Sequence, residues 1–373
     1  MKSLLCLALL AALLSPPIHA AAPIKVGEYA SLTGKEAGFG QTSHHGVVLA
    51  IEQINAAGGV LGRPLELAYE DNQTKAGESA TAVKKLISRD KVIALIGEVS
   101  STRSLEAAPV AQKNHIPMIT PAATNPQVTK AGNYIFRVCF IDPFQGTVMA
   151  KFAAQDLKVK RVAVLSSVSN AYSLGLAKYF KETFAAAGGD IVTEKSFSEG
   201  DKDFRAQLTA VKAANVEAVF VPSYYTEAAL IVRQARDLGI SVPFLGGDGW
   251  EDEQLLNIGG AAMNGCYYST HFSAQNTDPK VVKFVADYKA RWDGEQPGAF
   301  SALGYDAVYV LADALKRAGT TDAAKLRDAL AKTKNVEGVT GLTTLDKNRN
   351  ASKPATIIAI RDGKQEFLKT VAP

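Results

Sequence analysis

The stretch Val92-Ile93-Ala94-Leu95-Ile96-Gly97 is an apolar run without polar alternation, and it decides the fold. Strands that face water on one side alternate in polarity, whereas continuous apolar runs mark strands buried on both faces of a parallel sheet. A helical stretch from about Arg103 to Asn114 follows the run after a short loop. A buried strand that leads through a loop into a helix is the repeating unit of an α/β sheet covered on both faces.

Strand and helix patterns also alternate before and after this segment of the chain. A second series begins at Arg161, and Asp362-Gly363 near the end is a hairpin signal between two short strands. Asp142-Pro143-Phe144-Gln145 is expected to open a helix, with Asp142 as its cap. The predicted strands are Ile24–Ala30, Leu65–Tyr69, Val92–Gly97, Ile116–Thr120, Tyr134–Phe140, Arg161–Ser166, Ile191–Phe197, Ala218–Pro222, Pro243–Gly246, Asn264–Phe272, Gly341–Leu345, Thr356–Ile360 and Glu366–Val371. Two successive β/α series predict two doubly wound lobes, with ligands expected at the carboxyl ends of the strands.

The N-terminus has the pattern of a secretory signal peptide. Lys2 precedes an apolar run from Leu4 to Leu14, and small residues follow at Ala20-Ala21-Ala22. A positive end, a short apolar core and a small-residue exit are typical of such leaders, and this run is too short to span a bilayer as a helix. Cleavage after Ala20 is favoured over cleavage after Ala22, because Pro23 is a poor residue to follow the cut. The mature protein is expected to be soluble and outside the cytoplasm.

The composition of the mature chain favours two compact lobes and disfavours nucleic-acid binding. About 350 residues remain after the leader, which is more than one hydrophobic core usually holds. The formal net charge of +4 falls to +3 without Lys2, and no Lys/Arg stripe is interleaved with aromatic residues. Two cysteines, Cys139 and Cys266, are too few for a disulfide framework.

Motifs of the common enzyme classes are missing from the sequence. No Gly-x-Gly-x-x-Gly follows a strand, no Gly-x-Ser-x-Gly occurs, and Gly34-Lys35 lacks the first glycine and the Ser/Thr of a phosphate-binding loop. The four histidines of the mature chain show no metal-ligand spacing. The sequence therefore predicts no metal site and no cofactor, and it favours a solute-capturing protein over an enzyme.

Hydroxyl-bearing loops follow two strands of the first series. Ser100-Ser101-Thr102 comes after Val92–Gly97, where a hydroxyl can cap the helix or help its free N–H groups to hold an anion. An ordinary capping role is favoured for Ser100, and both roles stay open for Ser101. The loop Thr120-Pro121-Ala122-Ala123-Thr124-Asn125-Pro126 ends the next strand. Its prolines fix the backbone and leave carbonyls and a hydroxyl for the crevice, although a proline-rich turn explains the motif equally well.

An acidic group and aromatic residues stand at strand ends of the second series. In Gly246-Gly247-Asp248-Gly249-Trp250 the glycines allow close backbone approach. Asp248 can face a cation there, but an Asp among glycines is also a common turn former. Tyr172 and Tyr224 follow strands, where an aromatic ring can cover an apolar ligand while its hydroxyl reaches a polar group. Phe39, in the Gly34–Gly40 loop, is a similar candidate, and core packing is the competing explanation for all three.

Taken in order, these segments resemble the periplasmic leucine/isoleucine/valine-binding protein family of ABC importers. The matching stretches are Ile24–Gly34, Ile54–Val60, Arg63–Leu65, Asp71–Lys75, Ile96–Ser104, Pro117–Pro126, Phe136–Gln145, Tyr224–Glu227 and Leu245–Trp250. The resemblance covers nearly the whole mature chain. It implies a type I periplasmic binding protein with two Rossmann-like α/β lobes joined by three hinge crossovers. It also implies a periplasmic monomer that closes over one solute and delivers it to a membrane permease.

The resemblance implies binding residues by position. Ser101 and Thr124 would hold the α-carboxylate of an amino acid. The Ala122 carbonyl, the Thr124 hydroxyl and Asp248 would hold the α-ammonium group. The acidic position is often Glu in this family, so the shorter Asp248 needs a closer ligand or a water. The remaining residues would line the cleft or narrow its side-chain pocket, and they are Phe39, Tyr172, Tyr224 and Trp250.

The implied crossovers run through Val138–Phe140, Tyr267–Thr270 and Lys353–Thr356. After a signal peptide at residues 1–20, they place residues 21–138 and 271–352 in the N-terminal lobe. Residues 139–270 and 353–373 then form the C-terminal lobe. Cys139 and Cys266 would flank neighbouring hinge strands, which makes a disulfide between them a minor hypothesis beside two buried thiols.

The sequence and the resemblance together indicate the binding component of an ABC importer for an amino acid, branched-chain or aliphatic, without catalytic activity. Capture of another small solute, such as an amide, urea or an aromatic acid, is the first alternative. A sensor lobe that feeds a signalling partner is the second. An enzyme with an unrecognised site is the third, and the missing motifs disfavour it.

Overall fold

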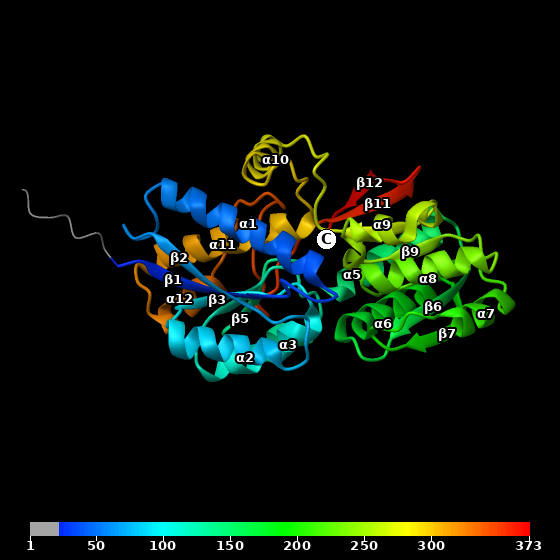
Figure 1. Cartoon of the computed structure of the whole chain (residues 1–373), viewed down its shortest axis with the longest axis horizontal. Coiled ribbons are helices and arrows are strands. Elements are labelled where there is room, and N and C mark those ends of the chain that lie inside the picture. Colours follow the sequence, from blue (N-terminus) through cyan, green and yellow to red (C-terminus); the bar gives the residue numbers. More distant parts are fainter. Residues whose placement is uncertain (1–21) are drawn as a thin grey trace, which may run out of the picture.

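The computed structural model describes residues 22–373, and it consists of two α/β lobes side by side along the longest axis (Figure 1). The predicted signal peptide at residues 1–20 lies outside the described residues and stays a prediction. Among residues 22–373, no helix has both the length and the apolar character needed to cross a membrane.

The first lobe is built on a five-stranded parallel sheet with the strand order β2-β1-β3-β4-β5. Its strands are β1 (Ile24–Ala30), β2 (Leu65–Asp71), β3 (Ala94–Ile96), β4 (Met118–Thr120) and β5 (Ile135–Arg137). Its helices are α1 (Ala37–Ala56), α2 (Glu78–Lys85), α3 (Ser101–Lys113), α4 (Gln127–Lys130), α10 (Pro279–Arg291), α11 (Ala299–Ala318) and α12 (Ala323–Ala331). Every residue of β3 is fully buried, as its apolar run predicts for a strand covered on both faces.

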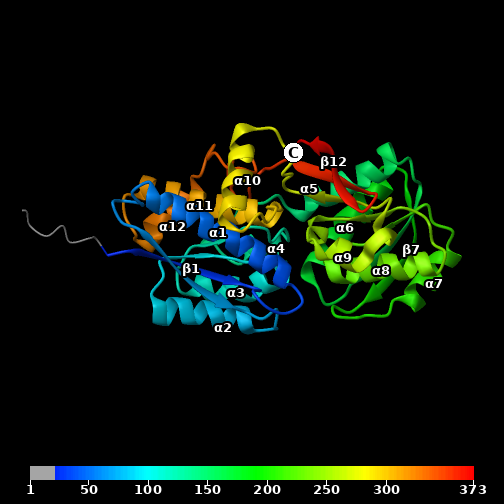
Figure 2. The ribbon, with the colours of Figure 1, turned by 45° about the horizontal axis from the view of Figure 1, so that its top comes forward.

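The second lobe is built on a seven-stranded sheet with the order β12-β11-β10-β9-β8-β6-β7. Its strands are β6 (Arg161–Ser167), β7 (Asp190–Phe197), β8 (Ala218–Phe220), β9 (Phe244–Gly246), β10 (Tyr267–Thr270), β11 (Ala355–Arg361) and β12 (Lys364–Val371). Its helices are α5 (Asp142–Lys151), α6 (Ala171–Ala186), α7 (Arg205–Ala213), α8 (Tyr225–Asp237) and α9 (Gln254–Gly259). The pairs β10–β11 and β11–β12 are antiparallel, and the other described strand pairs of this sheet are parallel. The C-terminus lies where the lobes meet (Figure 2).

The chain passes between the two sheets three times. It leaves the first sheet after β5 and enters α5, it leaves the second sheet after β10, and it returns at β11. Tyr267–Thr270 is β10 itself, paired with β9 and β11, so the second passage begins only after Thr270. The two-lobed α/β fold class is confirmed, and the domain boundaries by residue number stay a prediction.

Three local predictions from the sequence are wrong. Gly341–Leu345 is no strand, because Thr343 and Leu345 each form only an isolated bridge to a single residue. Asp142 is the first residue of α5 rather than its cap, and Ile141 occupies the cap position. The disulfide hypothesis fails as well, since Cys139 and Cys266 are both free and buried.

Candidate functional site

The loop after β3 brings the start of α3 to the carboxyl edge of the first sheet. Gly97 has a φ of +138°, and a Cβ there would strike the Tyr29 backbone, so only glycine fits this turn. Ser100 stands at the cap position but makes no capping bond, which contradicts the capping role expected for it. The Ser101 hydroxyl accepts the Asn125 N–H at 3.2 Å and so joins α3 to the loop after β4.

A buried arginine, Arg137, stabilises the loop after β4, residues 120–126, by hydrogen bonds to its backbone. Arg137 is fully buried and donates to the carbonyl oxygens of Ala123 and Asn125. Burial lowers the pKa of Arg137 from its ordinary value. The predicted ligand residue Thr124 is buried in this loop, and its hydroxyl has no hydrogen-bond partner in the described structure. An unpartnered buried hydroxyl is costly, which favours a ligand atom beside it.

Asp248 lies directly after β9 at the carboxyl edge of the second sheet and is 3% exposed. Its Oδ1 accepts from Gln145 Nε2 at 2.8 Å, and its Oδ2 lies 2.8 Å from His271 Nε2. The sequence analysis missed both partners. Gln145 belongs to the predicted helix start Asp142-Pro143-Phe144-Gln145, but no sequence spacing connects residues 145, 248 and 271.

Asp142 is a further acidic residue that the sequence analysis missed as a site residue. Its backbone N–H donates to the Thr124 carbonyl at 3.1 Å, and both of its buried carboxyl oxygens lack hydrogen-bond partners. Burial raises the pKa of Asp142 to about 8; the nearby Thr124 hydroxyl and Arg137 oppose this rise, and the negative charge of Asp248 adds to it. Asp142 therefore connects the Thr124 loop of the first lobe with the Asp248 side of the second.

Three aromatic residues pack together between the lobes. The rings of Tyr172 and Tyr224 stack at 5.3 Å between centroids, and Phe39 meets Tyr224 edge-on at 5.1 Å. The Tyr172 hydroxyl accepts the Gly249 N–H at 3.1 Å. Phe39 belongs to α1 of the first lobe and both tyrosines belong to the second, so this cluster spans the lobe interface.

Trp250 is fully buried inside the second lobe. Its Nε1 donates to the Val221 carbonyl at 3.0 Å, and its ring lies near Tyr268, 6.3 Å between centroids. Its indole also fills the space in which Gly246 would carry a Cβ. Its predicted effect on a ligand side chain stays a prediction.

Polar contacts join the lobes around these residues. Tyr224 donates to Ser100 Oγ at 3.0 Å, and Tyr225 donates to the Lys35 carbonyl at 2.9 Å. Ala171 at the start of α6 accepts from Asn125 Nδ2 at 2.7 Å and donates to Thr102 Oγ1 at 3.1 Å. These contacts describe a closed arrangement, in which all eight predicted binding residues are buried.

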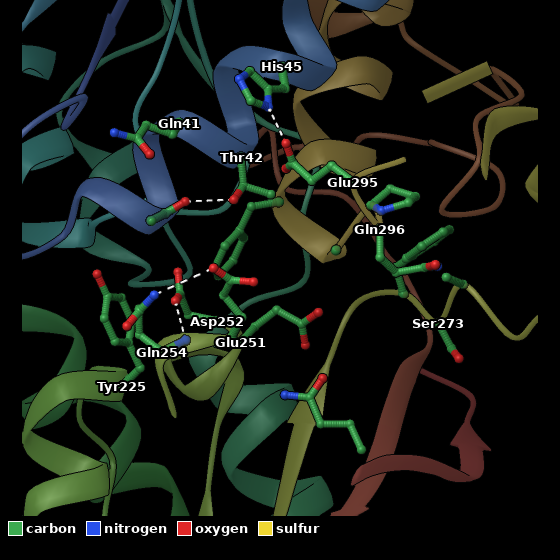
Figure 3. A pocket seen from close by; sticks show the side chains of 18 of the residues that line it. Gln41, Thr42, His45, Tyr225, Glu251, Asp252, Gln254, Ser273, Glu295 and Gln296 are labelled. Atoms are coloured by element: carbon green, nitrogen blue, oxygen red, sulfur yellow. Dashed lines mark hydrogen bonds and ion pairs between the residues drawn. The ribbon is translucent and has the colours of Figure 1, made fainter. Parts of the chain in front are cut away.

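A cavity of about 1060 Å³ opens between the lobes (Figure 3). Gln41, Thr42, His45 and Glu295 of the first lobe face Glu251 and Asp252 of the second across it. None of the eight predicted binding residues lines this cavity. Those residues are covered by the closed lobes, whereas the cavity lies beside β10 and the segment after it. Within residues 22–373, no group of three or more His, Cys, Asp or Glu side chains is arranged to hold a metal.

The fold has two lobes with mainly parallel sheets. The first lobe presents hydroxyls and the start of α3, and the second presents the carboxylate of Asp248. This arrangement is that of a two-lobed binding protein. The family model described as "Periplasmic binding protein" matches residues 23–365. The chain therefore belongs to the periplasmic binding protein family.

Individual relatives agree with this assignment. The chain is 34% identical over 312 residues to the leucine-, isoleucine-, valine-, threonine- and alanine-binding protein of Pseudomonas aeruginosa, which covers 83% of each chain. The crystal structure of the leucine-binding protein LivK of Thermotoga maritima superposes with a TM-score of 0.89 at 39% identity, covering 94% of this chain and 99% of that one. The isoleucine complex of LivJ, a branched-chain amino acid transporter substrate-binding protein of Streptococcus pneumoniae, gives a TM-score of 0.89 at 36% identity, with 94% and 100% coverage. These comparisons confirm the family resemblance and the type I fold.

Proposed function

We propose that this protein is the periplasmic substrate-binding component of an ABC importer and that it captures a branched-chain amino acid. Family membership supports the transport role, and relatives named for binding leucine, isoleucine and valine support the ligand class. The protein would act as a monomer, hand its ligand to a membrane permease and catalyse no reaction, as a solute-binding protein does.

The observation that carries the proposal is a buried carboxylate, Asp248, in one lobe and a buried hydroxyl without a partner, that of Thr124, in the other. Asp248 lies in the second lobe, and the free Thr124 hydroxyl belongs to the first lobe. A zwitterion placed between them has an acceptor for its ammonium group on one side. On the other side it meets hydroxyls and the start of α3 for its carboxylate. Buried charges need such partners because an unpaired buried charge is expensive.

The ligand would stabilise the closed state by bridging both lobes. A ligand shifts a conformational equilibrium only by binding one state better than the other. Asp248 and Thr124 belong to different lobes, so one small ligand would contact both of them only when the lobes are closed. The aromatic cluster of Phe39, Tyr172 and Tyr224 supplies the apolar cover. Hinge closure around a ligand is a common form of domain motion.

Isothermal titration calorimetry and thermal unfolding against a panel of small solutes test the proposal. The panel contains leucine, isoleucine, valine, acetamide, urea and benzoate. Saturation at a thousand times the dissociation constant stabilises the folded state by about 4 kcal/mol, so a branched-chain amino acid should raise the melting temperature visibly. The proposal is wrong if no amino acid binds while another solute of the panel does.

Asp248→Asn separates the proposed contact from general damage. Truncation of one partner of a buried charge pair costs about 2–5 kcal/mol, so this variant should bind isoleucine at least about thirtyfold more weakly. The matched control is Asp190→Asn, at an exposed position in β7 of the same lobe, and it should bind as the wild type does. Unchanged isoleucine binding by Asp248→Asn would remove Asp248 from the site.

A further inference from the structure

Both oxygens of Asp248 are held by side chains from segments that join the lobes. Gln145 lies in α5, the first helix after the chain leaves the first sheet, and His271 directly follows β10. Gln145 is fully buried and His271 is 5% exposed. The His271 ring also stacks on Phe140, in the segment between β5 and α5, with centroids 3.7 Å apart. The carboxylate is therefore fixed by the hinge region and not only by its own glycine-rich loop.

The hydrogen-bond pattern determines how each partner faces Asp248. A carboxylate only accepts, so Gln145 must present its NH₂ group, which leaves its amide oxygen turned away from Asp248. His271 Nδ1 is buried and unpartnered. The tautomer that carries its proton on Nε2 satisfies this arrangement, because it donates to Asp248 and buries no unpaired N–H.

The amide oxygen of Gln145 is a second acceptor beside Asp248 that a ligand can use. It is buried and has no hydrogen-bond partner in the described structure. The position that a Cβ of Gly247 would occupy lies 3.1 Å from this oxygen and 2.5 Å from the Tyr172 hydroxyl. The oxygen therefore lies beside Asp248 and beside the aromatic cluster. A donor on a ligand would satisfy it together with the free lone pairs of Asp248.

We propose that Gln145 and His271 are positioning residues that orient Asp248 toward the ligand's ammonium group, and that the Gln145 amide oxygen accepts a further hydrogen bond from that group. This inference rests on the proposed function and deepens it. The pair thereby sets the discrimination between an amino acid and the same molecule without its amino group. A carboxylate already held in place needs no reorganisation when the ligand binds.

The test compares dissociation constants for isoleucine and for 3-methylpentanoate, which has the same skeleton without the amino group. His271→Phe keeps an aromatic ring against Phe140 but removes the donor to Asp248. Gln145→Met removes both the donor and the second acceptor. Each variant should reduce the preference for isoleucine about tenfold or more, since each lost bond involves a charged group. Gln145→Met should reduce it further than His271→Phe.

Controls separate positioning from a merely structural role. His271→Gln restores a donor and should recover part of the preference, and His115→Phe, at an exposed position of the first lobe, should leave it unchanged. Equal losses of affinity for both ligands, or no change in their ratio, would overturn the inference. If His271→Phe does not fold, the dissociation constants of Gln145→Met for isoleucine and 3-methylpentanoate are sufficient to test the inference. A wild-type protein that binds no amino acid would instead refute the proposed function.

Discussion

Tyr224, directly before α8 of the second lobe, donates a hydrogen bond of 3.0 Å to the Ser100 hydroxyl, directly before α3 of the first. Both side chains are buried. Ser100 makes no capping bond to its own helix. A residue that a local rule assigns to helix capping is thus part of the contact that holds the lobes closed.

Tyr224→Phe should weaken ligand binding by roughly fivefold. The variant keeps the ring that stacks on Tyr172 but removes the bond to Ser100, and a buried hydrogen bond contributes about 1 kcal/mol net. Calorimetric titration with isoleucine measures the effect. Tyr69→Phe, at a position 56% exposed, is the control. An unchanged dissociation constant for Tyr224→Phe would mean that this bond does not favour the closed state.

Gly247→Ala should weaken isoleucine binding by crowding Tyr172 and not by straining the backbone. The φ of Gly247 is −115° and suits any residue, but an added Cβ would lie 2.5 Å from the Tyr172 hydroxyl. Overpacking of this kind costs about 1–3 kcal/mol, so isoleucine binding should weaken about tenfold as the ring of Tyr172 moves. Gly298→Ala, where the nearest atom would be 3.3 Å away, should have a smaller effect. Equal effects of the two variants would contradict the crowding argument.

Asp142 should make the folded protein less stable as the pH rises. Its pKa lies at about 8 in the folded state and at the ordinary 3.8 in the unfolded chain. The folded state therefore holds its proton longer, and stability is lost between about pH 4 and about pH 8. Asp142→Asn should flatten this decline in urea unfolding measured across that range. A decline as steep in the variant as in the wild type would show that other groups cause it.

Glu36 should make ligand affinity depend on pH through lobe closure. Both carboxyl oxygens of Glu36 are buried without a partner, and its pKa lies well above the ordinary value. Burial is the main cause of this rise, and Glu98 and Glu199 add to it, while Arg103 opposes it. Glu199 belongs to the second lobe and also pairs with Lys35 of the first at 3.2 Å.

Opening the lobes would withdraw Glu199 and expose Glu36 to water, so closure should take up a proton. Affinity for isoleucine should then fall as the pH rises above the ordinary range of a glutamate. Glu36→Gln should lose much of this dependence, and Glu66→Gln, half-exposed on β2, should keep it. Calorimetric titrations at several pH values measure both, and an unaltered pH profile in Glu36→Gln would contradict the linkage.

The arrangement of the sheets could be predicted from the sequence because it follows from local patterns. The apolar run around Ala94–Ile96 identifies a strand buried on both faces, and the carboxyl ends of parallel strands share one edge of the sheet. The sequence therefore predicts that Ser101, Thr124 and Asp248 lie at strand ends.

The contacts of the carboxylates could not be predicted, because they depend on how distant segments meet. Gln145 and His271 are 103 and 23 residues from Asp248 in the chain, and no periodicity connects such positions. Asp142 fits the sequence rule for a helix cap. The helix includes it, however, and its carboxyl group is buried, which only tertiary packing decides.

A crystal structure of the protein grown with isoleucine is the most direct test of the central claim. We expect one amino acid between the lobes, with its ammonium nitrogen within about 3 Å of an Asp248 oxygen and its carboxylate beside Ser101 and Thr124. An amino acid bound elsewhere, with Asp248 and Thr124 making no contact to it, would contradict the account.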